Sequence, residues 1–242
     1  MAHQDQCDIT SKDIQCFVFS WNEFYNNARK IETQLSNIGI DVKVINSSND
    51  RYDHWINLST DCYFNDQFSS ALDLFDRNKY KFFFHIQADA SIDNWLNIVH
   101  RFIYVANKYK IGIYAPLVEN VFYERQYHYG LLELNLVDVN FIDETVWFIN
   151  KEILSIFEKD IRKCFVDNFY GWGYDKVLCA LCHMSNMPVL MDTENKIQHP
   201  QKQNYETHKA NQNYITMINK LPQGVREFVH SMEFLPENIR NL

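Results

Sequence analysis

The sequence is poor in glycine, with 6 glycines in 242 residues, against an average of about 7%. Neither the Walker A pattern nor the G-x-G-x-x-G fingerprint occurs in it. Loops that hold phosphate through glycine backbone are therefore excluded. Positive charge is also scarce, because the sequence has 23 Lys and Arg residues against 31 Asp and Glu residues, which gives a net charge of −8. We expect no nucleic-acid partner, since such binding depends on neutralising phosphates.

Long apolar runs are missing as well. Runs such as Cys16–Phe19 and Val146–Ile149 fall far short of the ~20 residues that span a membrane. Met1–Thr10 is polar and has no basic stretch followed by an apolar one, so we expect no signal peptide. The six cysteines are irregularly spaced and indicate reduced thiols. We expect a cytoplasmic protein without a transmembrane segment, compatible with peripheral attachment at the inner face of a membrane.

In the first half of the chain, short apolar runs alternate with helical periodicities. Strand–helix–strand order predicts parallel pairs joined by right-handed crossovers. The predicted strands are Cys16–Ser20, Val42–Ile45, Phe82–Ile86 and Ile111–Pro116, and the predicted helices are Asn22–Ile38, Asp66–Phe75 and Asn94–Tyr109.

The second half is less regular. We expect strands at Leu131–Leu136, Thr145–Ile149 and Val189–Met191, helices at Lys151–Phe157, Asp175–Met184 and Tyr214–Leu221, and a last segment at Val225–Phe234. The sequence shows no linker and no internal repeat. It predicts one α/β domain over residues 1–242, with a mostly parallel open sheet flanked by helices. Within it we expect a nucleotide-binding half (about 14–115), a mixed acceptor-side half (about 116–200) and a helical tail (201–242).

Polar residues follow the first three predicted strands, at Ser20–Glu23, Asn46–Asp50 and Gln87–Asp89. In open α/β sheets, ligands bind at the carboxyl ends of the strands. Asp89 directly follows a very apolar strand, which suits a ligand for a divalent cation that bridges phosphate oxygens. A turn cap before the next helix is an equally compatible role.

Two of the six glycines, Gly171 and Gly173, bracket Trp172. Glycine adopts backbone conformations that other residues resist, so a bent segment is expected there. Asp175 falls at the start of a predicted helix, where it can cap the helix or take a proton from a sugar hydroxyl. His199 lies further downstream, and a lone histidine is more often structural than a ligand.

Taken in order over Cys16–Pro200, these motifs resemble the nucleotide-sugar glycosyltransferases of the GT-A (Rossmann-like) fold, and are similar to family 2. The resemblance implies a hexosyl transfer from a nucleotide sugar, UDP-sugars foremost, to a glycan or glycolipid acceptor in polysaccharide biosynthesis. It implies inversion with Asp175 as the base, and Mn²⁺ or Mg²⁺ held by Asp89 and His199. The substrate-binding residues that it implies are Ser20, Asn22, Glu23, Asn46, Ser47, Asp50, Gln87, Ala88, Gly171, Trp172 and Gly173.

Two positions depart from the family pattern. Gln87 replaces the first acid of the Asp-x-Asp motif, which removes one negative charge from the cation site. Tyr174 stands where the family often has an acid next to the base, so Asp175 is the only base in its segment.

Other functions stay open at this point. A non-catalytic carbohydrate- or nucleotide-sugar-binding protein of the same fold would explain Gln87. A nucleotidyltransferase normally has a glycine-rich basic loop after the first strand, which this chain lacks. Cys179-Ala180-Leu181-Cys182-His183 matches the pattern for covalent haem, but it lies in an amphipathic helix, where buried cysteines serve as small apolar residues.

Overall fold

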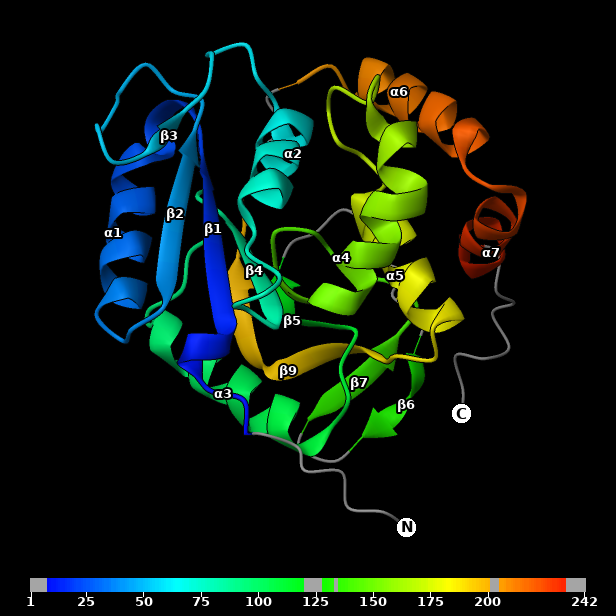
Figure 1. Cartoon of the computed structure of the whole chain (residues 1–242), viewed down its shortest axis with the longest axis horizontal. Coiled ribbons are helices and arrows are strands. Elements are labelled where there is room, and N and C mark those ends of the chain that lie inside the picture. The colour runs from blue at the N-terminus through cyan, green and yellow to red at the C-terminus, as the bar shows by residue number, and fades with distance from the viewer. Residues whose placement is uncertain (1–7, 120–127, 133–134, 201–204, 234–242) are drawn as a thin grey trace.

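The computed structural model describes residues 8–119, 128–132, 135–200 and 205–233. Its centre is a nine-stranded sheet in the order β3-β2-β1-β4-β8-β5-β9-β7-β6 (Figure 1). The strands are β1 (Ile14–Ser20), β2 (Asp41–Asn46), β3 (Ile56–Asn57), β4 (Phe82–Gln87), β5 (Ile113–Glu119), β6 (His128–Leu132), β7 (Leu136–Val139), β8 (Val146–Asn150) and β9 (Val189–Gln198).

Seven α-helices surround the sheet within the described residues. They are α1 (Tyr25–Ser36), α2 (Phe64–Leu74), α3 (Trp95–Lys108), α4 (Lys151–Ile156), α5 (Tyr174–Met184), α6 (Thr207–Lys220) and α7 (Gln223–Glu233). Short 3₁₀ turns lie at Ser11–Asp13, Asn22–Phe24 and Arg162–Phe165, and a π turn lies at Phe157–Ile161.

The predicted strand–helix–strand unit is confirmed. Strands β1 and β2 pair in parallel, with Cys16 opposite Val42, and β4 pairs in parallel with the other side of β1. Every residue of β1 is buried, as expected of a strand covered on both faces. Helix α1 buries a stripe of apolar residues, and the chain turns after it at Gly39, where φ is +80°. A left-handed glycine just beyond a helix is a common way to end it.

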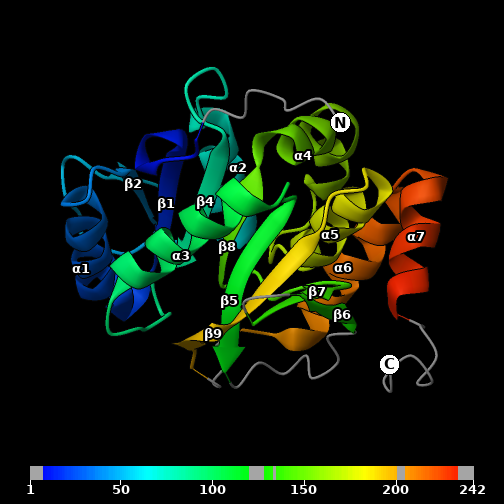
Figure 2. The same ribbon diagram turned by 90° about the horizontal axis from the view of Figure 1, so that it is seen from below.

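Helices cover both faces of the sheet (Figure 2). Side chains from α1 and α3 form one buried cluster on one face. Side chains from α2, α4 and α5 form a second cluster on the other face. The molecule therefore has the predicted α/β architecture, with a mostly parallel sheet between two helical layers.

The mixed character of the second half is also confirmed, with corrections to its elements. Strand β8 is antiparallel to both β4 and β5. The single strand expected at Leu131–Leu136 is wrong, because β6 and β7 are two antiparallel strands in which Leu132 pairs with Leu136. Residues 133–134 between them, and Phe234 of the last predicted segment, lie outside the described residues.

Two further elements are longer than expected. Strand β9 continues seven residues past Met191, to Gln198, because β5 and β7 both supply pairing partners along it. Helix α6 begins at Thr207, well before the predicted start at Tyr214. The sequence pattern missed its first turns because they are polar and show little apolar periodicity. The proposed division of the domain near residue 115 falls within β5 and stays a prediction, and residues 201–204 and 234–242 of the proposed tail lie outside the described residues.

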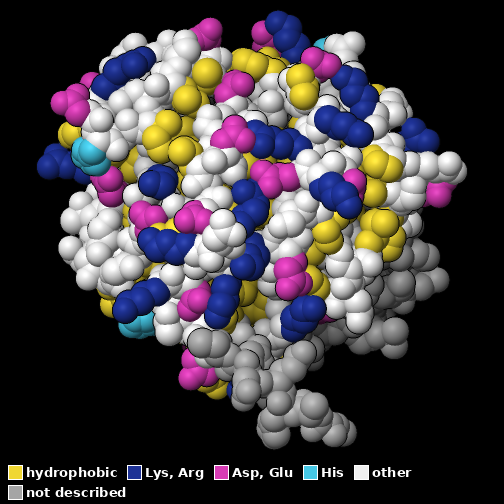
Figure 3. Space-filling model, viewed as in Figure 1, with side chains coloured by type: hydrophobic (Ala, Val, Ile, Leu, Met, Phe, Trp, Pro, Cys, Tyr) yellow, Lys and Arg dark blue, Asp and Glu magenta, His cyan; other side chains and the backbone are white. Residues whose placement is uncertain are grey.

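On the face shown in Figure 3, Lys and Arg side chains lie among Asp and Glu side chains. Within the described part of the chain, no helix combines the length and apolar character needed to cross a membrane.

Candidate functional site

A cavity of about 570 Å³ lies at the carboxyl ends of β1 and β4, where α2 begins. Most residues expected in a site lie along its walls, although they come from segments far apart in the sequence. The expected site residues that line this cavity are Asn22, Glu23, Ser47, Gln87, Asp89, Trp172, Gly173, Asp175 and His199.

Other expected residues lie outside this cavity. Asp50 lines a smaller hollow of about 220 Å³, which shares Asn22, Glu23 and Ser47 with the main cavity. The expected residues that line neither hollow are Ser20, Asn46, Ala88 and Gly171.

Both the nitrogen and the oxygen of the Asn46 side-chain amide form hydrogen bonds within the protein. Its Nδ2 donates to the backbone oxygen of Asp50 at 2.8 Å and to Oδ1 of Asn57 at 3.0 Å. Its Oδ1 accepts bonds from the backbone N–H and the hydroxyl of Ser48. Asn46 is fully buried and holds the turn after β2 in shape, so it has no polar atom to offer a ligand.

The turn that carries Asp89 is held from two sides. Nδ2 of Asn27, on α1, donates to the backbone oxygens of Ala88 at 2.7 Å and Ala90 at 2.9 Å. The N–H of Gln87 donates to the backbone oxygen of Thr145, just before β8. The turn therefore presents the Asp89 side chain at a fixed point at the end of β4.

Strand β9 brings His199 to the same point. Ser91 and Gln198 exchange backbone hydrogen bonds of 2.9 and 3.0 Å, which places the residue after Gln198 beside the Asp89 turn. Nε2 of His199 lies 3.2 Å from Oδ2 of Asp89. Burial lowers the pKa of His199, but the hydrogen bond and charge of Asp89 outweigh it, and the pKa is raised overall.

The Asp89–His199 pair fits a divalent cation only in part. Oδ1 of Asp89 is buried and has no hydrogen-bond partner among the described residues. No group of three or more His, Cys, Asp or Glu residues that could hold a metal occurs in the described ranges. Mg²⁺ is commonly held by one or two protein ligands while phosphate oxygens and waters complete its shell. A cation at Asp89 and His199 would therefore need phosphate oxygens of a bound ligand, together with waters, to complete its coordination shell.

The bend around Trp172 depends on both of its glycines. Gly171 has a φ of +79°, and a Cβ there would lie 2.5 Å from the ring of Phe64. Gly173 has a φ of +98° and precedes the first residue of α5. Nδ2 of Asn168 donates to the backbone oxygen of Trp172 at 2.8 Å and closes the loop. These features hold the bend in the segment, and Trp172 lies on the wall of the cavity.

Asp175 lies in the first turn of α5 and is 8% exposed. Burial raises its pKa to about 6, although the charge and backbone N–H of Lys176 act in the opposite direction. The preceding residue, Tyr174, is buried in the core, where its hydroxyl donates to Oδ1 of Asn65. A carboxyl with a pKa near neutrality is suited to general base catalysis.

Two further carboxyl groups line the cavity and were missed in the sequence, Asp143 and Glu144. They immediately precede β8, and the antiparallel direction of β8 places them at the carboxyl end of β4. Burial, together with the charges of Asp175 and Asp143, raises the pKa of Glu144 well above its usual value. In the sequence, Asp143 and Glu144 stand out only because they lie next to an apolar strand. That position does not reveal the direction of the strand, and so does not show that they reach the ligand-binding edge of the sheet.

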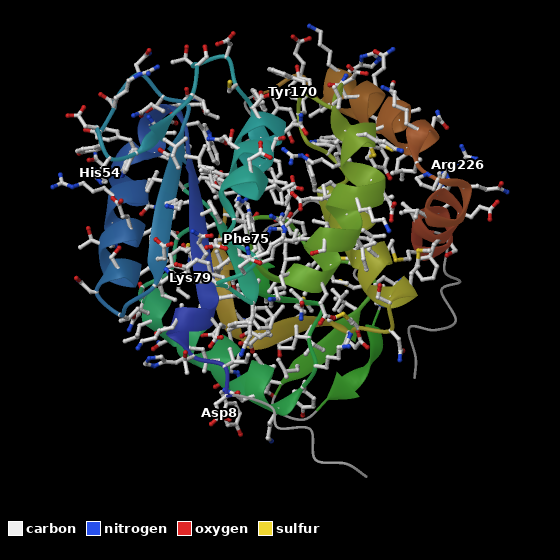
Figure 4. The ribbon with its side chains drawn as sticks, in the orientation of Figure 1. Asp8, His54, Phe75, Lys79, Tyr170 and Arg226 are labelled. Atoms are coloured by element: carbon white, nitrogen blue, oxygen red, sulfur yellow. The ribbon has the colours of Figure 1, made fainter. Side chains whose placement is uncertain are left out.

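Aromatic side chains also gather at the cavity. Nε1 of Trp172 donates to the hydroxyl of Tyr205 at 2.9 Å. The ring of Tyr63, just before α2, lies 5.1 Å from that of Tyr170 and 6.0 Å from that of Tyr205. Figure 4 shows Tyr170 at the end of the molecule where α2 begins. Part of the aromatic excess therefore lines this site, and most of the rest is core.

Cys179 and Cys182 are completely buried in α5. Burial raises the pKa of both thiols, which leaves them protonated and unreactive. Their role as small apolar core residues agrees with the sequence interpretation.

No protein-family model and no curated protein matches this sequence. Among solved structures, A197 from STIV is 16% identical, with 77% of this chain and 82% of that chain covered and a TM-score of 0.38. TarS 1–349 from S. aureus, a glycosyltransferase in complex with UDP-GlcNAc, is 9% identical, with 92% of this chain and 73% of that chain covered and a TM-score of 0.53. At this identity the likeness to TarS concerns the fold alone. The chain thus has a glycosyltransferase-like, Rossmann-type α/β fold.

Proposed function

We propose that this protein is a glycosyltransferase of the family 2 type, which moves a sugar from a nucleoside diphosphate sugar to an acceptor hydroxyl. The observation that carries the proposal is the cavity at the strand ends. In it Asp175, a buried carboxyl with a pKa of about 6, shares the walls with the Asp89–His199 pair. The carboxyl ends of the strands are where open α/β sheets bind their ligands.

In the proposed reaction, Asp175 accepts the proton of the acceptor hydroxyl. The acceptor oxygen bonds to the anomeric carbon while the bond from that carbon to the diphosphate breaks. The electron pair of the broken bond leaves with the nucleoside diphosphate. Attack from the face opposite the leaving group inverts the anomeric configuration. The burial of Asp175, with a smaller contribution from the charge of Asp143, raises the pKa of Asp175, so it is a stronger base than a solvated carboxylate.

Negative charge grows on the diphosphate as the bond breaks. We propose that Asp89 and His199 hold Mn²⁺ or Mg²⁺ there, with Gln87 and Ala88 in the same turn. When bound, such a cation would neutralise this growing charge. Asp89 and His199 are already positioned without it, by the Asn27 bonds and the Ser91–Gln198 pair.

For the substrates, we propose a UDP-sugar as donor and a glycan or glycolipid as acceptor, with Trp172 against the acceptor sugar. The aromatic rings around Trp172 support this, since they provide a large apolar surface with polar edges. TarS was crystallised with UDP-GlcNAc, which makes UDP-GlcNAc the first donor to test. Attachment to the inner face of a membrane would bring a glycolipid acceptor within reach.

The test is an assay for released nucleoside diphosphate, with UDP-sugars and GDP-sugars as donors, in Mn²⁺, Mg²⁺ or EDTA. We expect turnover with at least one donor, and its loss in D175N. The exposed Asp160 provides a matched control, because D160N makes the same chemical change away from the cavity. Binding of a nucleotide sugar without any turnover would reject catalysis and favour a binding protein of the same fold.

A further inference from the structure

Glu144 is a carboxyl group of the cavity wall that the proposed reaction does not use. Its Oε2 is buried and has no hydrogen-bond partner among the described residues. The charges that act on it are those of two other carboxylates, Asp175 and Asp143. A buried carboxylate oxygen that faces further negative charge and receives no hydrogen bond is costly. The surroundings of Glu144 therefore favour its neutral, protonated form.

Ionisable side chains approach Glu144 from three segments. Asp143 precedes it in the chain, Asp175 and Tyr174 come from the first turn of α5, and Tyr205 lies just before α6. Burial raises the pKa of both phenols, to about 12 for Tyr205, so neither carries charge near neutral pH. The charge that Glu144 meets is therefore negative and comes from the two aspartates.

Asp175 and Glu144 stand beside each other at the start of α5, where the backbone N–H of Asp175 faces the Glu144 carboxyl. Two neighbouring buried carboxyls cannot both ionise cheaply, so one of them keeps its proton. The positive charge of Lys176 favours the ionised form of Asp175, whose pKa is about 6. Burial and the two aspartates raise the pKa of Glu144 well above its usual value. Asp175 therefore ionises while Glu144 stays neutral.

We propose that Glu144 is a positioning residue for the base, which keeps its own proton and donates it in a hydrogen bond to the carboxylate of Asp175. This inference deepens the proposed function and rests on it. The bond fixes the rotation of the Asp175 carboxylate and leaves its second oxygen to the acceptor hydroxyl. The pair enters the reaction with one proton, on Glu144. Asp175 takes the second proton from the acceptor as the new glycosidic bond forms, and releases it to solvent after the product leaves.

The order of ionisation can be tested without any substrate, by carbon-13 NMR titration of the side-chain carboxyls. In the wild type, Asp175 should ionise near pH 6 and Glu144 at a higher pH. E144Q should leave the pKa of Asp175 near 6, because a neutral Glu144 exerts no repulsion for the amide to remove. D175N should lower the pKa of Glu144, because it removes the largest charge acting on that group. A Glu144 that ionises before Asp175, or a lower pKa of Asp175 in E144Q, would overturn the proposal.

Activity tests the hydrogen bond itself through two variants of similar length. The amide of E144Q can still donate to Asp175, whereas the side chain of E144M cannot. Release of nucleoside diphosphate should therefore be about tenfold or more slower in E144M than in E144Q. If E144M does not fold, the titrations and the pH profile of E144Q decide the matter.

The pH profile separates this role from simple support of the fold. Wild-type turnover should fall at alkaline pH, because an ionised Glu144 loses the hydrogen bond and adds a second negative charge beside the diphosphate. E144Q should not show this fall, since its amide does not ionise. E152Q is the matched control, because Glu152 is exposed on α4, and it should keep the alkaline fall of the wild type.

The possible outcomes are distinct. If E144Q is as inactive as D175N, if E144M matches E144Q, or if E144Q keeps the alkaline fall, this inference is wrong while wild-type turnover still supports the proposed function. If the wild type turns over no nucleotide sugar, the proposed function fails, and the role of Glu144 fails with it.

Discussion

Replacing Asp175 with Asn removes a charge from the cavity and keeps the shape of the side chain. The carboxyl ionises near 3.8 in the unfolded chain and at about 6 in the folded protein. At about 1.36 kcal/mol per pKa unit, this difference corresponds to at most about 3 kcal/mol. Between these two pH values the folded state binds the proton more strongly. Stability is therefore lost as pH rises through about 6, and above it the buried carboxylate destabilises the fold.

D175N should therefore be more stable than the wild type at pH 8, by about 1–3 kcal/mol, because the amide carries no charge to bury. For a chain of this size, that raises the melting temperature by several degrees, at about 2–4 °C per kcal/mol. At pH 4 the wild-type carboxyl is protonated when folded, so the two proteins should melt at nearly the same temperature.

Activity should change in the opposite direction. Removal of a general base typically costs about 10²–10⁴-fold in rate, and we expect D175N to lose turnover in that range. In the wild type, kcat/KM should fall about tenfold for each pH unit below 6, as Asp175 becomes protonated. The assays are nucleoside diphosphate release from pH 5 to 9 and thermal melts at pH 4 and 8. Full turnover in D175N, or the same gain in stability at both pH values, would refute the reasoning.

The remaining predictions concern the loop, the core and the cation. In thermal melts, G171A should lose about 1–3 kcal/mol more stability than G39A does. Both glycines have a similar positive φ, but only at Gly171 would the new Cβ collide with a ring. Y114F should lose about 1–3 kcal/mol in urea unfolding, since the 2.6 Å bond to buried Asp192 is lost, while turnover stays unchanged. Mn²⁺ should raise the melting temperature of the UDP complex in the wild type but not in D89N, and an equal increase in both would contradict cation binding at Asp89.

Much of the first half of the fold could be predicted from local pattern. The apolar run at β1 and the helical spacing of Ala28, Ile31 and Leu35 reflect burial that each segment achieves against its immediate neighbours. The separation of β6 from β7 could not be predicted in this way, because over Leu131–Leu136 leucines alternate with Glu133 and Asn135, a pattern that indicates a single strand. The full length of β9 depends on pairing with β5 and β7, which are remote in sequence.

The candidate site was predictable where it follows a parallel strand. Asp89 comes directly after β4, and a polar residue at such a strand end points to the ligand-binding edge of the sheet. Asp143 and Glu144 were missed because they precede a strand, and only the reversed direction of β8 brings them to that edge.

By itself, the sequence determined the alternation of strands and helices, the order of the polar strand ends and the bend around Trp172, because all of these are local properties of the chain. Only the tertiary structure decided which polar groups meet and which remain available to a ligand. It brings His199 beside Asp89 and engages the side-chain amide of Asn46 in hydrogen bonds inside the protein. Hydrogen bonding between distant residues depends on where the strands and helices pack, and packing is a property of the whole fold.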